Sequence, residues 1–211
     1  MLANRRFTNP RHECAMARRH LNKIVFVALA VGLAGCATQP RNINDVCAVL
    51  EQQDGWISNW QRSAKKAERR HGIPMAILLA TIRKESGFKS NARPPRTQLL
   101  GFIPWKRQSS AYGYAQALDG TWAQYKKERG GFSSSRDDFD DAVDFVGWYH
   151  GKTAKTYGVA PNDAYSLYLA YYSGWSAFGK GTWRSNAGLQ RAARETAEMA
   201  IRYEKQLESC R

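Results

Sequence analysis

The segment from Ile73 to Gly87 constrains the fold most, because it sets one carboxylate on the apolar side of a helix. Its apolar residues recur at helical spacing and form a single stripe, which consists of Met75, Leu78, Leu79 and Ile82. Glu85 continues that stripe. Pro74 suits the first turn of a helix and Gly87 suits its end. The pattern therefore predicts a helix over about 74–86 with Glu85 in its last turn.

The place of Glu85 in that helix predicts a raised pKa for its carboxyl group. The helix dipole disfavours a negative charge in the last turn, and partial burial disfavours the charged form as well. A raised pKa suits a general acid that works near neutral pH. The alternative is a glutamate that closes an ion pair at a helix end, and the rest of the chain must decide between the two.

The first 35 residues have the layout of a signal peptide. Arg18, Arg19 and Lys23 precede an apolar run over 24–34 that is too short to span a bilayer. The run ends in Leu-Ala-Gly-Cys, which resembles the bacterial lipobox, whose cysteine is acylated. We therefore expect a lipid on Cys36, a polar tether over 36–44 and, because Ala37 follows the cysteine, the periplasmic face of the outer membrane. The better signal layout after Met16 favours that residue over Met1 as the true start.

Two further cysteines, Cys47 and Cys210, lie at the two ends of the presumed domain. In an oxidising compartment they could form a disulfide. Closing so long a loop would stabilise the fold by roughly 4–5 kcal/mol in the chain-entropy account. The alternative is a pair of unbonded, buried thiols.

The charge of the chain is strongly basic. From Cys36 onward, 26 Lys and Arg stand against 17 Asp and Glu, a net charge of +9. Such a protein is expected to meet anionic lipid and a cell wall that carries carboxylates. Nucleic acid is excluded as a partner, because the chain has an export signal and no nucleic-acid-binding motif.

Residues 45–211 have the length of one domain with its own core. Helical patterns appear over about 45–70, 74–86, 119–129, 137–157, 162–173 and 187–208. Strand signals are poor, and the span 91–110 is mostly loop because it contains three prolines. We expect a mainly α single domain, with a short loop or hairpin region beside the candidate cleft.

Four short motifs follow one another in the mature chain: Glu-Ser-Gly-Phe at 85–88, Gly-x-x-Gln at 113–116, Thr-Trp at 121–122 and Ala-Tyr-x-x-Gly at 170–174. In this order they resemble the soluble lytic transglycosylase (SLT) catalytic domain of the lysozyme-like superfamily. Each motif alone is weak, whereas four in register over roughly 73–175 are specific. The resemblance implies a lysozyme-like fold and an enzyme.

The resemblance also implies a reaction. Lytic transglycosylases cleave the β-1,4 bond between N-acetylmuramic acid (MurNAc) and N-acetylglucosamine (GlcNAc) in peptidoglycan without using water. One glutamate protonates the departing oxygen and then acts as base while the C6 hydroxyl of the MurNAc closes a 1,6-anhydro ring. Since the substrate supplies the nucleophile, the second carboxylate of ordinary glycosidases is not required.

By position in these motifs, Glu85 is the implied acid and base, and Ser86 is its supporting neighbour. Tyr171 is expected to hydrogen-bond Glu85 from a facing helix, since a tyrosine hydroxyl can hold a carboxyl in either protonation state. The implied substrate-binding residues are Gly113, Tyr114, Gln116 and Tyr172. For several of these a purely structural role is the alternative: a turn residue for Gly113 and Gln116, a core aromatic for Tyr171.

The chain departs from the family pattern in two places. Tyr172 stands where the family has Asn, which removes an amide from one wall of the cleft. The span between Glu85 and Gly113 is also long and contains an apolar and then basic insert at 98–107. The insert could be a lid, a substrate-selecting flap or a membrane-touching loop, but a loop that packs its own apolar residues on the domain is favoured.

Further residues are of types that could contribute to a site. One or two aromatics are expected to line a sugar-binding groove, and the candidates are Trp122, Trp148, Tyr149, Tyr168, Trp175 and Trp183. The aspartates over 137–144 are expected to stabilise a helix N-terminus, because they lack the EF-hand pattern. His71 and His150 lack zinc-ligand spacing. We therefore expect no metal and no cofactor.

Three functions remain open from the sequence. The first is a lytic transglycosylase with Glu85 as its single acid and base. The second is a hydrolytic muramidase on the same fold, which would need Asp119 or an aspartate of 137–144 as a second carboxylate. The third is a non-catalytic, lipid-anchored peptidoglycan-binding protein. Endo or exo cleavage, a need for peptide stems, protein partners, oligomeric state and the cellular process served are not readable from the sequence.

Overall fold

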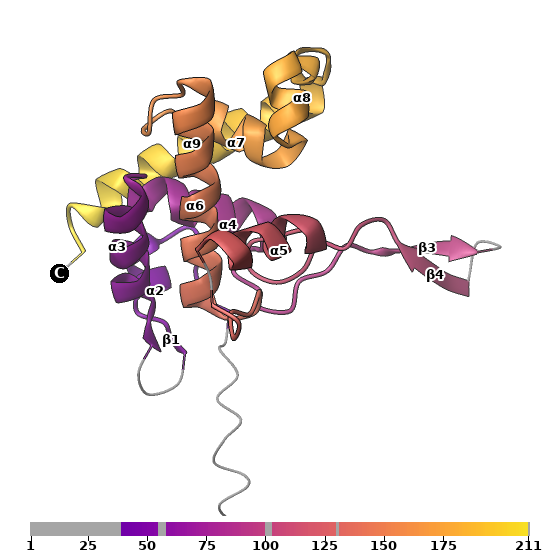
Figure 1. Cartoon of the computed structure of the whole chain (residues 1–211). Coiled ribbons are helices and arrows are strands. Elements are labelled where there is room, and N and C mark those ends of the chain that lie inside the picture. The colour runs from indigo at the N-terminus through magenta and orange to yellow at the C-terminus, as the bar shows by residue number, and fades with distance from the viewer. Residues whose placement is uncertain (1–38, 55–57, 100–102, 130, 211) are drawn as a thin grey trace, which may run out of the picture. The chain divides into compact units, whose positions relative to one another are not determined.

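The computed structural model describes residues 39–54, 58–99, 103–129 and 131–210. The predicted signal peptide and Cys36 lie outside the described residues. In chain order the elements are α2 (Val46–Leu50), β1 (Gln53–Asp54), β2 (Ser58–Asn59), α3 (Trp60–His71), α4 (Met75–Ser86), β3 (Arg96–Leu99), β4 (Ile103–Arg107), α5 (Asp119–Glu128), α6 (Phe139–Tyr157), α7 (Ala164–Ser173), α8 (Trp175–Lys180), the 3-10 turn η1 (Thr182–Ser185) and α9 (Ala187–Leu207) (Figure 1). The mainly α fold class is confirmed.

Local sequence sets where most helices begin and end. Asp or Asn side chains accept the free backbone N–H groups at helix starts, as Asn59 does for α3, Asp138 for α6, Asp163 for α7 and Asn186 for α9. Glycines in the left-handed backbone conformation, which would strain a residue with a side chain, end three of the helices: Gly72 ends α3, Gly87 ends α4 and Gly158 ends α6. The expected role of the aspartates before α6 as helix-stabilising residues therefore holds for Asp138.

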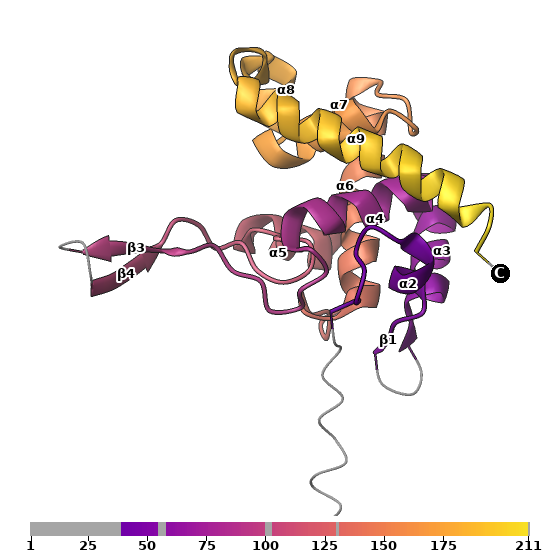
Figure 2. The same ribbon diagram turned by 180° about the vertical axis from the view of Figure 1, so that it is seen from behind.

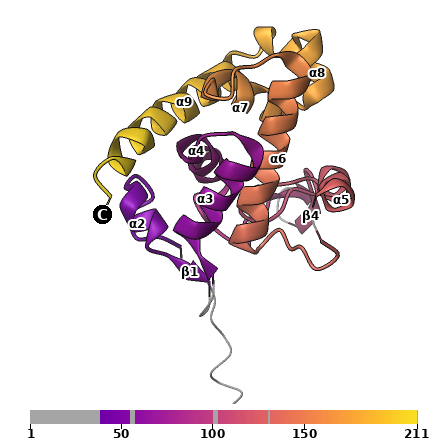
Figure 3. The ribbon, with the colours of Figure 1, turned by 60° about the vertical axis from the view of Figure 1, so that its left-hand side comes forward.

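The helix α4 lies at the centre of the fold. Figure 3 shows it between α3, α6 and α9, and all eight residues from Met75 to Ile82 are buried. The sequence predicted one apolar stripe, but the whole run Met-Ala-Ile-Leu-Leu-Ala-Thr-Ile is apolar or small, which suits a helix covered on all sides. Only the last turn, with Glu85, reaches the edge of the core.

An aromatic cluster supports the start of α6 and the end of α4. Trp60 stacks on Phe139 with ring centroids 3.9 Å apart, and Tyr114 meets both rings edge-on. Phe88, which follows the end of α4, packs on Trp60 at 5.7 Å. These contacts hold α4, the loop before α5 and α6 in one arrangement, and this arrangement positions the site.

The predicted helix over 45–70 is divided in the structure. Residues 53–54 pair antiparallel with residues 58–59, so a small hairpin separates α2 from α3. Asn59 then starts α3 as a new helix by accepting from the N–H of Arg62. The sequence also gave no sign of α8 and η1, which follow α7 directly.

The insert at 98–107 forms most of a second hairpin. β3 pairs antiparallel with β4, with Arg96 opposite Arg107, and Figures 1 and 2 show this hairpin reaching beyond the helices. The described side chains of its base are exposed: Arg96, Thr97, Gln98, Lys106 and Arg107. The favoured prediction, a loop that packs on the domain, is therefore not met for this base, because the two strands satisfy their backbone groups on each other.

The two ends of the domain are joined. Cys47 in α2 and Cys210 beyond α9 form a disulfide. The segment predicted as a tether also contacts the domain over its described part, since Gln39 donates to the carbonyl of Gly87 at 2.7 Å and Tyr203 donates to the carbonyl of Ile43. Among the described residues, no helix has the length and apolar character to cross a membrane.

Candidate active site

Glu85 occupies the last turn of α4, as predicted, and is half-buried, with one oxygen of its carboxylate withdrawn from solvent. The Oε1 atom is buried and has no hydrogen-bond partner among the described residues. Burial raises the pKa of Glu85 to about 7, although a hydrogen bond from Tyr168 and the charge of Lys84 both act to lower it. The carboxyl group is therefore balanced between its acid and base forms near neutral pH.

Two tyrosines of α7 face Glu85, but the hydrogen bond to its carboxyl comes from a different tyrosine than predicted. The Tyr171 hydroxyl donates to the backbone carbonyl of Ala115 at 2.6 Å, whereas the hydrogen bond to Glu85 comes from Tyr168. Tyr171 is still within electrostatic reach of Glu85. Burial raises the pKa of the Tyr171 hydroxyl most, and the charge of Glu85 raises it further. The predicted Tyr171–Glu85 hydrogen bond is corrected to Tyr168, one helical turn earlier.

A pocket of about 160 Å³ opens beside Tyr171, and we call it the candidate cleft. It lies between the start of α5, the middle of α6 and the end of α7. Its lining residues are Gln116, Ala117, Leu118, Thr121, Phe145, Tyr149, Tyr171, Tyr172, Ser173 and Gly174. Tyr172, predicted to bind substrate, is 62% exposed at this pocket. Tyr149 is the predicted groove aromatic that lines it.

Gln116 lines the candidate cleft in a strained backbone conformation. Its φ of 48° is in the left-handed region, which costs a non-glycine residue on the order of 1–3 kcal/mol. Its amide nitrogen donates to the carbonyls of Ala92 and Gly113, both at 2.9 Å. These bonds hold the loop and leave the amide oxygen as the group that can meet a ligand.

Three predicted site residues serve the fold instead. Ser86 donates to the carbonyl of Ile82 in its own helix. A side chain on Gly113 would come within 2.0 Å of the carbonyl oxygen of Arg136, so this glycine allows a close approach of the chain to itself rather than to a ligand. Tyr114 is 1% exposed in the aromatic cluster. The supporting role of Ser86 and the substrate-binding roles of Gly113 and Tyr114 are not favoured by this geometry.

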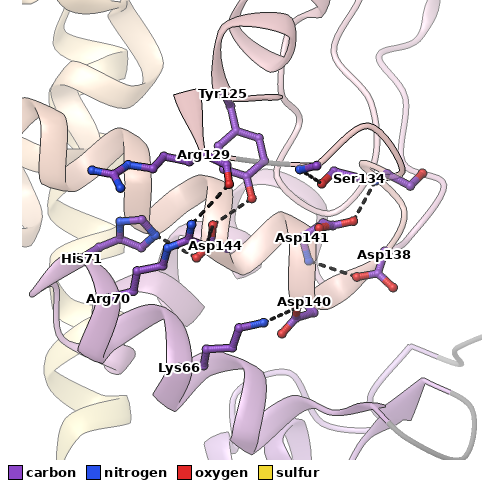
Figure 4. A network of polar contacts seen from close by, with 12 residues as sticks. Lys66, Arg70, His71, Tyr125, Arg129, Ser134, Asp138, Asp140, Asp141 and Asp144 are labelled. Atoms are coloured by element: carbon purple, nitrogen blue, oxygen red, sulfur yellow. Dashed lines mark hydrogen bonds and ion pairs between the residues drawn. The ribbon is translucent and has the colours of Figure 1, made fainter. Parts of the chain in front are cut away.

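The aspartates considered as a second carboxylate are occupied elsewhere. Asp119 pairs with Arg136 at 2.8 Å. Asp144 is buried and bonds His71 and Arg70 of α3 and Tyr125 of α5, as Figure 4 shows. The other aspartates of 137–144 contact Tyr112 before α5, the loop before α6, the start of α6 or Lys66, and they are Asp137, Asp138, Asp140 and Asp141. Within the described part of the chain, no cluster of His, Cys, Asp and Glu could hold a metal ion.

Comparisons with known proteins identify the family and the fold of this chain. The family model described as "Transglycosylase SLT domain" matches residues 24–210. The chain belongs to the transglycosylase SLT domain family. This membership confirms the predicted family and the lysozyme-like fold class.

A solved structure is also similar to this SLT domain chain: an inactive mutant of the lytic transglycosylase Slt from Pseudomonas aeruginosa. The TM-score is 0.53 and the sequence identity is 15%, over 72% of this chain and 25% of that protein. The chain thus spans a quarter of the length of its structural relative, and the likeness concerns the fold alone. No curated protein matches the chain.

Sequence reasoning missed part of this SLT site. Tyr168 was considered only as a groove aromatic, although it lies three residues before Tyr171 and so shares a side of α7 with it. Phe145 was not considered, although it lies four residues before the predicted Tyr149 on α6, a spacing that places both on one face. That spacing was a usable signal. Thr121 and Ser173 gave none, because small polar residues are common at helix ends.

Proposed function

We propose that this SLT domain protein is a peptidoglycan lytic transglycosylase that cleaves the MurNAc-β-1,4-GlcNAc bond and leaves 1,6-anhydro-MurNAc ends. The observation that carries the proposal is Glu85: a carboxyl with a buried, unpartnered oxygen and a pKa of about 7, next to Tyr168 and Tyr171. Such a group can give a proton and take one back at the same pH.

The proposed reaction uses Glu85 twice. In its acid form Glu85 protonates the glycosidic oxygen, and the bond from that oxygen to C1 of the MurNAc breaks. The Glu85 carboxylate then removes the proton from the C6 hydroxyl of the same sugar, whose oxygen bonds to C1. The proton balance of the enzyme is restored, and no water enters the product.

The surroundings of Glu85 support one carboxylate rather than two. The described lining of the candidate cleft includes no Asp or Glu, and Glu85 itself lies behind the lining residue Tyr171 rather than in the lining, so the cleft offers no second carboxylate. The side chains available to a hydrolytic muramidase, Asp119 and the aspartates of 137–144, are bonded to other groups. A water-activating base would therefore have to leave an existing ion pair or helix cap.

Digestion of purified sacculi tests the proposal, with the wild type beside Glu85→Gln and the products identified by mass spectrometry. We expect anhydromuropeptides from the wild type and a loss of at least about a thousandfold in rate for Glu85→Gln, which keeps the shape but removes the transferable proton. Reducing ends would favour the muramidase. Binding to sacculi with no products would favour the non-catalytic binding protein.

We also propose that the protein is lipidated at Cys36 and faces the periplasm from the outer membrane. The support is the lipobox-like sequence after an apolar run, while the disulfide between Cys47 and Cys210 is consistent with an oxidising compartment. Labelling with radioactive palmitate, lost in Cys36→Ala, checks this proposal, and label retained by Cys36→Ala would refute it.

A further inference from the structure

A second pocket, of about 290 Å³, lies where α3, α5 and α6 end, and we call it the basic pocket. We propose that it binds a carboxylate of a peptide stem whose sugar occupies the candidate cleft. The inference rests on the proposed function, because it names a second point at which the same substrate is held.

The charges of the basic pocket favour an anion. Its lining includes one carboxylate, that of Glu128, and four basic side chains, which are Arg70, Arg129, Lys152 and Lys155. Lys152 pairs with Glu128 at 2.8 Å, and Arg70 pairs with Asp144 beneath the pocket at 3.0 Å. Arg129 and Lys155 are exposed and have no ion-pair partner within the described residues. Two cations are therefore free to meet a ligand.

The walls of the basic pocket are held in place before any ligand arrives. Glu128 accepts from the indole N–H of Trp148 at 3.1 Å as well as from Lys152. The Lys152 ammonium in turn lies 5.2 Å from the Trp148 ring centre and 5.1 Å from that of Trp175. Side chains that are already ordered lose little freedom when a ligand binds.

Two helices connect the candidate cleft with the basic pocket. On α5 the residues Thr121 and Glu128 are seven positions apart, one at each pocket, and on α6 the same holds for Phe145 and Lys152. Seven positions return to the same helix face after about 10 Å. The helices run side by side in the same direction, since the rings of Trp122 and Phe145 are 5.3 Å apart and Lys152 reaches Glu128.

That separation fits a peptide. An extended chain covers roughly 3.3–3.6 Å per residue, so about three residues bridge the two pockets. A stem attached to a sugar in the candidate cleft could thus set a carboxylate between Arg129 and Lys155. The competing explanation is that these cations only offset the dipoles of helices that end here, since Lys155 lies in the last turn of α6.

The test measures binding of the full-length chain in detergent, with Glu85→Gln as background so that strands stay intact. The ligands are two soluble glycan strands, one with peptide stems and one from which an amidase has removed them. The variants are Arg129→Glu and Lys155→Glu. Lys205→Glu is the matched control, because Lys205 is also an exposed cation in the last turn of its helix, α9.

We expect Arg129→Glu and Lys155→Glu each to weaken binding of the stem-bearing strand about fivefold to tenfold. Binding of the stripped strand should be unchanged, and Lys205→Glu should change neither. Unchanged binding of the stem-bearing strand would overturn the inference. Equal weakening for both strands would do so too, because it would indicate a general electrostatic effect. Lys155→Ala, which adds no new charge, repeats the test if a reversal variant fails to fold.

This experiment is independent of turnover. If sacculi yield no anhydromuropeptides but the stem-dependent binding is found, the proposed enzyme activity fails and the basic pocket stands. If anhydromuropeptides appear and both variants bind like the background protein, the enzyme stands and the basic pocket fails.

Discussion

The carboxyl of Glu85 suits the proposed acid because α4 carries it to the edge of the core, where the residue is half-buried and its Oε1 atom is shielded from solvent. Eight buried residues precede the last turn, and the helix ends at Gly87, whose N–H donates to the carbonyl of Arg83. The buried Oε1 atom has no hydrogen-bond partner among the described residues, so it is available to the substrate oxygen of the proposed reaction. An unpaired buried acceptor is costly in a resting fold, which is typical of groups kept for function.

The hydrogen bond from the Tyr168 hydroxyl lowers the pKa of Glu85. In the wild type, kcat/KM should fall as pH rises through about 7, because the acid form of Glu85 is lost. Tyr168→Phe removes a hydrogen bond that favours the carboxylate, so the pKa of Glu85 rises. The alkaline limb of the pH profile should move up by about one pH unit. Initial rates on soluble glycan strands across pH measure the shift.

Tyr171→Phe is the matched control for Tyr168→Phe. It removes a hydroxyl from the same helix, but that hydroxyl donates to Ala115 and not to Glu85. Its rate should drop modestly while the alkaline limb stays near the wild-type pH. A shift with Tyr171→Phe and none with Tyr168→Phe would restore the assignment first made from the sequence.

The sequence predicted the position of Glu85 in its helix but not the tyrosine that hydrogen-bonds to it. The helical stripe placed Glu85 correctly because the spacing of apolar residues is a local property. The partner of Glu85 depends on the rotation of α7 against α4, which no local pattern records. Tyr168 and Tyr171 are both compatible with the motif, and only tertiary packing decides which hydroxyl reaches the carboxylate.

The elements around the site are joined through Asp144 of α6. It bonds two residues of α3, Arg70 and His71, and the hydroxyl of Tyr125 in α5 (Figure 4). Burial alone would raise the pKa of Asp144, but the hydrogen bonds of His71 and Tyr125 and the charges of His71 and Arg70 outweigh it and hold the pKa below its ordinary value. One carboxylate thus fixes α5 and α6, which form two walls of the candidate cleft.

Asp144→Asn should lower the free energy of unfolding by about 2–3 kcal/mol at neutral pH, because it leaves Arg70 without its counter-ion and takes from His71 and Tyr125 the carboxylate that they contact. A carboxyl whose pKa is depressed stabilises the fold above its unfolded value and ceases to do so as pH falls through its folded value. The difference between wild type and variant should therefore shrink below about pH 4. Urea unfolding across pH measures it.

Asp140→Asn is the control for Asp144→Asn on the same helix. Asp140 pairs with Lys66, and their side chains are 36% and 55% exposed. We expect a change below about 1 kcal/mol, since exposed pairs contribute little. Equal losses in the two variants would contradict the special role given to Asp144.

Helices with continuous apolar periodicity were predictable, and breaks within such patterns were not. The spans of α4, α5, α6, α7 and α9 follow the sequence within a few residues. The predicted helix over 45–70 failed because the hairpin of β1 and β2 interrupts a pattern that stays helix-like on both sides. The hairpin of β3 and β4 was expected only in outline, since its place relative to the helices depends on long-range contacts.

For the whole molecule, the described chain returns on itself at one end of the fold. The disulfide joins α2 to the residues after α9, and Gln206 accepts from the N–H of Val46 at 2.9 Å. Gln39 lies against the carbonyl of Gly87, two residues beyond Glu85. The segment that leads from the proposed lipid site thus begins its described course beside the end of α4 that carries the candidate acid.

The basic pocket and the candidate cleft together extend the proposed substrate contact over two helices. The positive charge of the molecule would then have a defined use, because Arg129 and Lys155, which have no ion-pair partner among the described residues, line the pocket where a stem would end. The sequence predicted an anionic wall as the partner from net charge alone. It could not locate the contact, since Arg129 and Lys155 are far apart along the chain.

Digestion of sacculi in heavy-oxygen water tests whether the proposed Glu85 reaction cleaves the glycan without water. The wild type should release muropeptides whose new MurNAc ends carry no heavy oxygen and are lighter by one water than hydrolytic ends. Glu85→Gln should release none above background. Heavy oxygen at the new ends would contradict the account, because it would show that water, and not the C6 hydroxyl of the sugar, attacks C1.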